Sequence, residues 1–135
     1  MRPRKVVLLI NDREQERNCW TLVFESTCKF RVISEGAMPW EFHEEPEIAV
    51  LRGPGIDRNI RLLRQLMPRV RILVITDSHD IHADRKLPST ANMYELMDAL
   101  RTLAVRKHGP KKWDFEPAAL PVTSSVLLGV TENVQ

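Results

Sequence analysis

Three near-continuous apolar runs constrain the fold of this chain more than any other feature. They span residues 5–10, 47–51 and 71–75, and none shows the polar alternation of a half-exposed strand. Such runs are typical of strands buried on both faces, as in a parallel sheet that helices cover. The sequence therefore has the pattern of an α/β protein.

Helical patterns alternate with these runs. Apolar residues recur at helical spacing over residues 13–25, 56–67 and 93–107, and residues 30–34 alternate as a further short strand would. Pro39 interrupts the segment between that strand and the second run, so we expect one short turn there instead of a full helix. Its apolar side chains are expected in the core: Met38, Trp40 and Phe42. Strands alternating with helices predict parallel βαβ units.

Polar residues stand where the predicted strands end. Asn11 and Asp12 follow the first run, Arg52 follows the second, and Thr76 follows the third. Because an open parallel sheet presents its chemistry at the carboxyl ends of its strands, these four residues are the candidate site.

Residues 4–107 resemble the receiver domain of bacterial two-component response regulators. In that family an acidic pair closes the first strand, a phosphate-accepting Asp the third, a Thr or Ser the fourth, and a Lys followed by Pro the fifth. The matching positions here read Asn11-Asp12, Arg52, Thr76 and Ser89-Thr90. The resemblance implies a flavodoxin-like, doubly wound sheet of five parallel strands.

Arginine at position 52 is incompatible with the phosphoryl chemistry of that family. An acyl phosphate requires a carboxylate nucleophile and a divalent cation held by further carboxylates, whereas a guanidinium stays protonated and accepts nothing. We expect Arg52 to form an ion pair with Asp12 instead, in the place of the family's metal ion and Lys. The site is therefore predicted to be a degenerate phospho-acceptor site, with no catalytic residue, metal or cofactor.

The segment after Thr76 is too short for the helix that the family has there. Six residues, 77–82, separate Thr76 from Ala83, so this fourth helix is predicted to be reduced or absent. We expect its loss to uncover apolar surface, which a protein partner, a second copy of the chain or the folded-back tail then covers, with a partner or second copy favoured. The predicted interaction face contains Lys86, where the family has an aromatic switch residue, together with Met93, Met97 and Leu100.

Two other functions stay open at this stage. Asp77, His79, Asp80 and His82 crowd potential metal ligands into one loop, as in a small metal-dependent enzyme, although their spacing matches no familiar zinc signature. The segment 58–64 places Arg58, Arg61 and Arg64 along one helix, which is compatible with phosphate contacts of a nucleic acid. No aromatic platform accompanies them, so nucleic-acid binding is not the expected function.

Charge and length set the remaining expectations. The chain of 135 residues has 20 basic and 18 acidic residues, which argues against a nucleic-acid arm or a membrane-surface protein. We expect one receiver-like domain over 1–108, a tail over 109–135 that is partly disordered or packed back, and a cytoplasmic location. The sequence thus predicts a stand-alone degenerate receiver, not an enzyme, that signals by protein–protein interaction without phosphorylation of an Asp.

Overall fold

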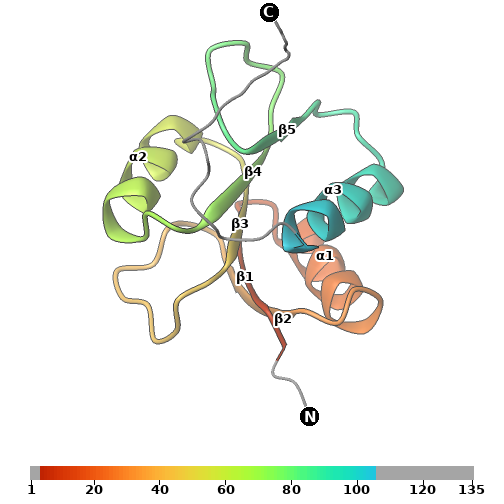
Figure 1. Cartoon of the computed structure of the whole chain (residues 1–135). Coiled ribbons are helices and arrows are strands. Elements are labelled where there is room, and N and C mark those ends of the chain that lie inside the picture. Colours follow the sequence, from red (N-terminus) through yellow and green to blue (C-terminus); the bar gives the residue numbers. More distant parts are fainter. Residues whose placement is uncertain (1–3, 106–135) are drawn as a thin grey trace, which may run out of the picture. The chain divides into compact units, whose positions relative to one another are not determined.

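The computed structural model describes residues 4–105. The elements, in chain order, are β1 (Val6–Asn11), α1 (Glu14–Ser26), β2 (Arg31–Glu35), β3 (Ile48–Arg52), α2 (Ile56–Leu66), β4 (Arg71–Ile75), β5 (Arg85–Leu87) and α3 (Met93–Val105) (Figure 1). Among the helices of this part of the chain, none is long and apolar enough to cross a bilayer. The predicted tail, 109–135, lies outside the described residues.

The strands form one five-stranded parallel sheet in the order β2-β1-β3-β4-β5. This is the predicted doubly wound, flavodoxin-like arrangement, with the switch point between β1 and β3. The register places Asn11 opposite Arg52 at the carboxyl ends of those two strands. The fold therefore brings the first and third predicted strand ends together at the switch point.

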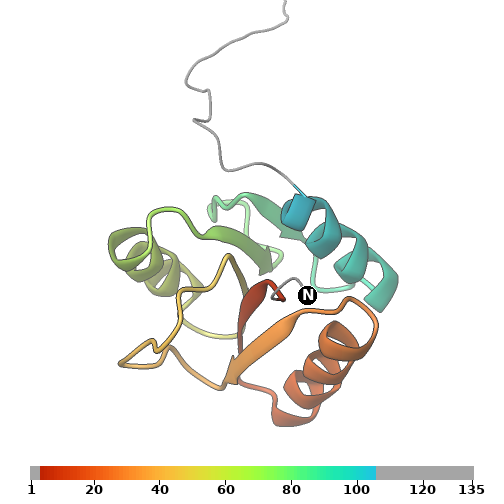
Figure 2. The ribbon, with the colours of Figure 1, turned by 60° about the horizontal axis from the view of Figure 1, so that its bottom comes forward.

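Helices cover both faces of the sheet. Helices α1 and α3 lie on one face and α2 lies on the other (Figures 1 and 2). Side chains of β1 pack alternately on the two faces of the sheet. Val7 and Leu9 belong to one core cluster, whereas Leu8 and Ile10 belong to the other. All four are at most 3% exposed, and each such side chain contributes about 1.5–3 kcal/mol by burial. This double burial explains why the run lacks polar residues.

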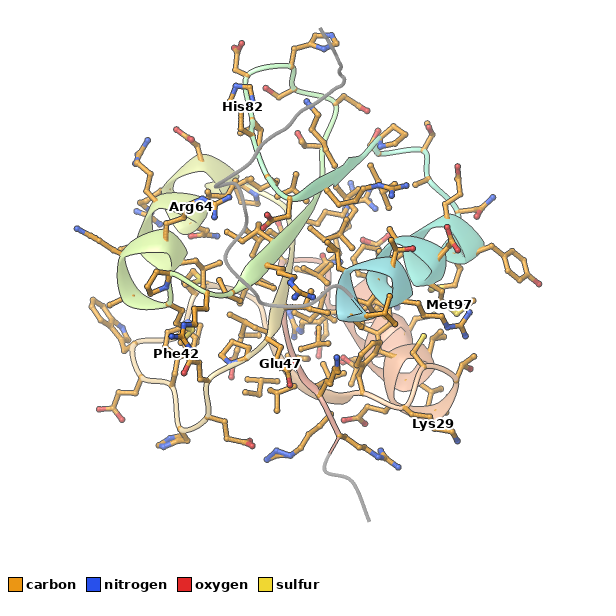
Figure 3. The ribbon with its side chains drawn as sticks, in the orientation of Figure 1. Lys29, Phe42, Glu47, Arg64, His82 and Met97 are labelled. Carbon is orange, nitrogen blue, oxygen red and sulfur yellow. The ribbon has the colours of Figure 1, made fainter. Side chains whose placement is uncertain are left out.

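Two connections carry no helix. The segment between β4 and β5 is irregular, as predicted, and so is the segment between β2 and β3, where a short helical turn was expected. Both segments nevertheless pack apolar side chains against the α2 face of the sheet: Met38, Phe42, Ile81 and Ala83. Figure 3 shows Phe42 on the β2–β3 connection, close to α2. These irregular connections thus cover part of the α2 face of the sheet.

Two apolar residues do not lie where the sequence placed them. Trp40 was expected in the core, but it is 100% exposed, because Pro39 and the irregular backbone turn it away from the sheet. Leu100 was assigned to the interaction face, but it is 0% exposed and packs in the core beneath α3. Moreover, α3 covers the face opposite α2, so loss of the fourth helix does not uncover it.

Helix α3 is held at both ends. At its start, the Asn92 backbone N–H donates to Glu95 Oε1 over 2.8 Å, and the Glu95 N–H donates to Asn92 Oδ1 over 2.9 Å, which is a capping box. At its end, the Lys5 ammonium donates to the carbonyl of Ala104 and the Arg71 guanidinium donates to that of Leu103. Cations at the negative end of a helix stabilise it, and here β1 and β4 anchor α3 in this way.

Candidate functional site

The candidate site begins with Asn11, the last residue of β1. Its side chain is fully buried, and its Nδ2 donates to Glu16 Oε1 over 2.9 Å. Its Oδ1 accepts from the Arg13 backbone N–H over 2.9 Å, which turns the chain from β1 into α1. Asn11 therefore fixes the position of Glu16, an acidic residue in the first turn of α1.

Arg52 reaches from the end of β3 toward α1. Its Nη1 donates to Glu16 Oε2 over 3.3 Å, and its Nη2 lies 3.5 Å from the backbone oxygen of Ser89. The guanidinium also lies 5.9 Å from the centre of the Trp20 ring, within cation–π range. The Arg52 side chain is 16% exposed and that of Glu16 is 27% exposed, so solvent screens this ion pair only in part.

The predicted ion pair of Arg52 with Asp12 is therefore wrong: the partner is Glu16. Asp12 is exposed, and its carboxylate lies against Gly53, where a Cβ would be 2.5 Å from Asp12 Oδ1. Gly53 has a φ of +110°, a conformation that glycine adopts at little cost. The missing side chain at position 53 leaves room for Asp12, while Arg52 turns toward the neighbouring helix.

Asp77 and Ser89 join the ends of β4 and β5. Asp77 Oδ1 accepts from the Ser89 backbone N–H over 2.9 Å, and Asp77 Oδ2 accepts from Ser89 Oγ over 2.5 Å. Hydrogen bonds from the Ser89 hydroxyl and from its N–H hold the pKa of Asp77 below its ordinary value, and the charge of Arg52 acts in the same direction. Thr76 is half-buried, and its Oγ1 accepts from the Ser78 N–H over 3.2 Å.

These contacts form one chain of polar side chains across the carboxyl edge of the sheet, which we call the edge network. It runs through Asn11, Glu16, Arg52, Ser89 and Asp77, and it joins β1, α1, β3, the loop after β4 and the segment after β5. Three of these residues were predicted site positions. Glu16 and Trp20 were missed, although an acidic residue in the first helical turn after a strand-end site is a signal that could have identified Glu16.

The loop between β4 and β5 does not gather metal ligands. Among residues 4–105, no group of three or more His, Cys, Asp or Glu side chains is placed to hold a metal ion. Asp77 is engaged by Ser89, and Figure 3 shows His82 on the outer part of this loop. Lys86, exposed on β5, donates from Nζ to the backbone oxygen of Ser78 over 2.9 Å and so braces the same loop.

The arginines of α2 line one open surface pocket: Arg58, Arg61 and Arg64. Arg61 Nη1 pairs with Asp57 Oδ2 over 2.7 Å, one turn earlier on the same helix. The side chain of Arg58 folds back toward Gly55 at the start of the helix, with its Nη2 4.0 Å from the position of a Cβ there. Arg64 lies in the last turn of this helix, which Figure 3 shows with Arg64 labelled. The pocket therefore carries all three charges, of which that of Arg61 is paired within the helix.

The exposed side of α3 retains part of the predicted interaction face. Met93 and Met97 are half-buried, and Tyr94 beside them is 79% exposed. Positions three and four apart lie on the same side of a helix, so Tyr94 and Met93 both neighbour Met97. Figure 3 shows Met97 on the outer part of α3.

Comparison with known proteins shows the fold. No protein-family model matches the chain, and no curated protein matches it. Among solved structures, a response regulator from Thermotoga maritima superimposes with a TM-score of 0.64 at 13% identity, covering 77% of this chain and 100% of that one. The BeF3-activated DrrB receiver domain gives 0.58 at 12% identity, with 77% and 100% covered.

A third structure agrees with these two. The phosphorylated cyanobacterial phytochrome response regulator RcpA gives a TM-score of 0.54 at 12% identity, covering 75% of this chain and 91% of that one. Because identities at this level carry information about the fold alone, the likeness is one of backbone architecture. The chain has the receiver-domain fold.

Proposed function

We propose that this chain is a degenerate receiver-like signalling protein that acts by protein–protein interaction, without phosphorylation of an Asp and without enzymatic activity. The observation that carries the proposal is Arg52 at the carboxyl end of β3, hydrogen-bonded to Glu16 and facing Ser89. By the resemblance, this is the position of the phosphate-accepting Asp. The likeness to receiver domains supports a signalling role.

The edge network supports the absence of phosphoryl chemistry. A divalent cation at this edge requires free carboxylates, but Glu16 is engaged by Asn11 and Arg52, and Asp77 is engaged by Ser89. A fixed guanidinium also repels a cation that approaches Asp12. Arg52 thereby substitutes for both the metal ion and the acceptor as the centre of the site.

A protein partner or a second copy of the chain would use the exposed side of α3 and the neighbouring edge strand. The face now consists of Lys86, Met93, Tyr94 and Met97, because Leu100 is in the core. Exposed Tyr and half-buried Met are residue types that interfaces favour. β5 is one of the two edge strands of the sheet, and no strand among residues 4–105 pairs with its outer side.

Phosphoryl transfer tests the first part of the proposal. We expect no change in intact mass when the full chain is incubated with acetyl phosphate and Mg²⁺. A stoichiometric gain of one phosphoryl group that hydroxylamine releases would show an acyl phosphate and would contradict the proposal.

Association tests the second part. We expect sedimentation velocity to show that Tyr94→Asp weakens self-association, or binding of a candidate partner protein, while Leu22→Asp does not. Leu22 is a suitable control, because it is 67% exposed and lies on α1. Equal effects of the two substitutions would exclude the α3 face as the contact.

A further inference from the structure

A second feature of the carboxyl edge lies on the α2 side of Arg52. A pocket of about 210 Å³ opens between the end of β1, the β2–β3 connection and the start of α2. Its lining includes Gly36, Met38, Arg52, Arg58 and Asn59. Apart from Arg52, none of these residues belongs to the edge network, so the pocket is a separate site.

Asn59 gives the pocket a mostly buried amide that has no hydrogen-bond partner in the described part of the chain. This residue is 6% exposed, and its side chain makes no hydrogen bond to any of residues 4–105. Its amide atoms are not fully sealed from solvent, so they open onto the pocket that the residue lines. A ligand in the pocket would supply the missing partner.

Two positive charges beside the pocket have no carboxylate partner within the described part of the chain. Arg58 folds back over Gly55, with its Nη2 4.0 Å from the position of a Cβ there. The guanidinium of Arg17 lies against Gly36, with its Nη1 3.0 Å from the position of a Cβ there, and it donates to the backbone oxygen of Asn11. Arg52, by contrast, is already neutralised by Glu16.

The start of α2 adds backbone donors to the same place. Its N-cap residue is Gly55, in the left-handed conformation with a φ of +75°, and no side chain caps the first turn. Asp57, the acidic residue of that turn, pairs with Arg61 instead. The free N–H groups of an eleven-residue helix therefore face the region that Arg58 covers.

We propose that this pocket binds the phosphate group of a small organic molecule. The two unpaired guanidinium groups match the charge of a phosphate dianion better than that of a monocarboxylate, and guanidinium and amide donors suit its oxygens. Met38 and Ile10 offer an apolar wall to the carbon part of the ligand. A volume below the usual range for drug-sized ligands, about 300–1,000 Å³, favours a molecule smaller than a nucleotide.

Titration with inorganic phosphate tests the proposal on the full chain. We expect saturable shifts of the Asn59 side-chain amide and of the Gly55 and Arg58 backbone amides in ¹H–¹⁵N spectra. Acetate at equal ionic strength should give much weaker shifts at the same signals. No saturable shift at these signals, or an equal response to acetate, would overturn the proposal.

A matched pair of arginines separates specific binding from general attraction. Arg58→Gln should weaken phosphate binding about tenfold, because it removes a charge-assisted hydrogen bond. Arg64→Gln removes the same charge from the same helix outside the pocket and should change binding by less than about twofold. Equal losses would mean that phosphate only accumulates near a basic surface.

A third variant tests the role of Asn59. Asn59→Leu keeps the approximate size of the side chain but removes its donors, so phosphate binding should fall while the spectrum stays that of the folded protein. If this variant unfolds, the comparison of Arg58→Gln with Arg64→Gln still decides the question. Unchanged phosphate binding by folded Asn59→Leu would contradict the proposal that the Asn59 amide contacts the phosphate.

Discussion

At the scale of single residues, the choice of partner for Arg52 decides what the site is. The sequence placed Arg52 and Asp12 at neighbouring strand ends, which the register of β1 with β3 confirms for Asn11 and Arg52. The sequence could not show that the Asp12 carboxylate lies against Gly53, or that Asn11 positions Glu16 by a hydrogen bond. Side-chain direction after a strand end depends on the local backbone, and a pattern of residue types does not encode it.

The Glu16 partnership predicts a specific loss of stability. Glu16→Gln should lower the free energy of unfolding by about 1–2 kcal/mol, because it leaves a mostly buried guanidinium without its charged partner. Glu14→Gln, an exposed residue in the same helical turn, should change it by less than about 0.5 kcal/mol. Urea denaturation measures both. Similar small effects would mean that the ion pair contributes nothing to stability.

The contact of Asp77 with Ser89 predicts a dependence on pH. The folded-state pKa of Asp77 is lowered, so this contact contributes stability above the unfolded pKa, and the contribution disappears as the pH falls through the folded value. Ser89→Ala should raise the pKa of Asp77 toward its ordinary value, since it removes the hydroxyl donor. Carboxyl ¹³C titration measures the shift. An unchanged pKa would show that the hydroxyl bond is absent in solution.

At the scale of elements, the apolar runs predicted the strands because strands buried on both faces have a distinctive composition. The three helices followed from the helical spacing of their apolar residues. The burial of Leu100 could not be predicted in the same way. It depends on how α3 is rotated on the sheet, which the contacts of Lys5 and Arg71 with its last carbonyls help to fix.

The irregular β2–β3 connection predicts opposite behaviour for two nearby aromatic residues. Phe42→Ala should lower the free energy of unfolding by about 1–3 kcal/mol, less than a fully buried Phe because Phe42 is half-buried. Trp40→Ala should leave stability nearly unchanged, because Trp40 is fully exposed. Thermal or urea unfolding compares the two. A large loss for Trp40→Ala would mean that its side chain packs on the domain.

At the scale of the whole molecule, the backbone has the receiver-domain fold, but the residues at the carboxyl edge of its sheet differ from the residues of that family. The five-stranded sheet keeps the receiver order even where two connections have no helix, because Met38, Phe42, Ile81 and Ala83 still complete the core on the α2 side. The strand ends keep their geometry as well, but their residues form a closed polar network. A scaffold can retain its packing while the chemistry at its edge changes.

The most direct test of this account is a titration of the full chain with Mg²⁺ and beryllofluoride, followed by ¹H–¹⁵N spectra. Beryllofluoride mimics a phosphoryl group on a carboxylate at equilibrium, so rapid hydrolysis cannot hide a reactive site. The account predicts no saturable shift at Thr76 or Ser89, whereas Arg52→Asp should show weak Mg²⁺ shifts there, since it adds a second carboxylate near Asp12. Saturable shifts of these two signals in the unaltered chain would contradict the claim that Arg52 has closed the site.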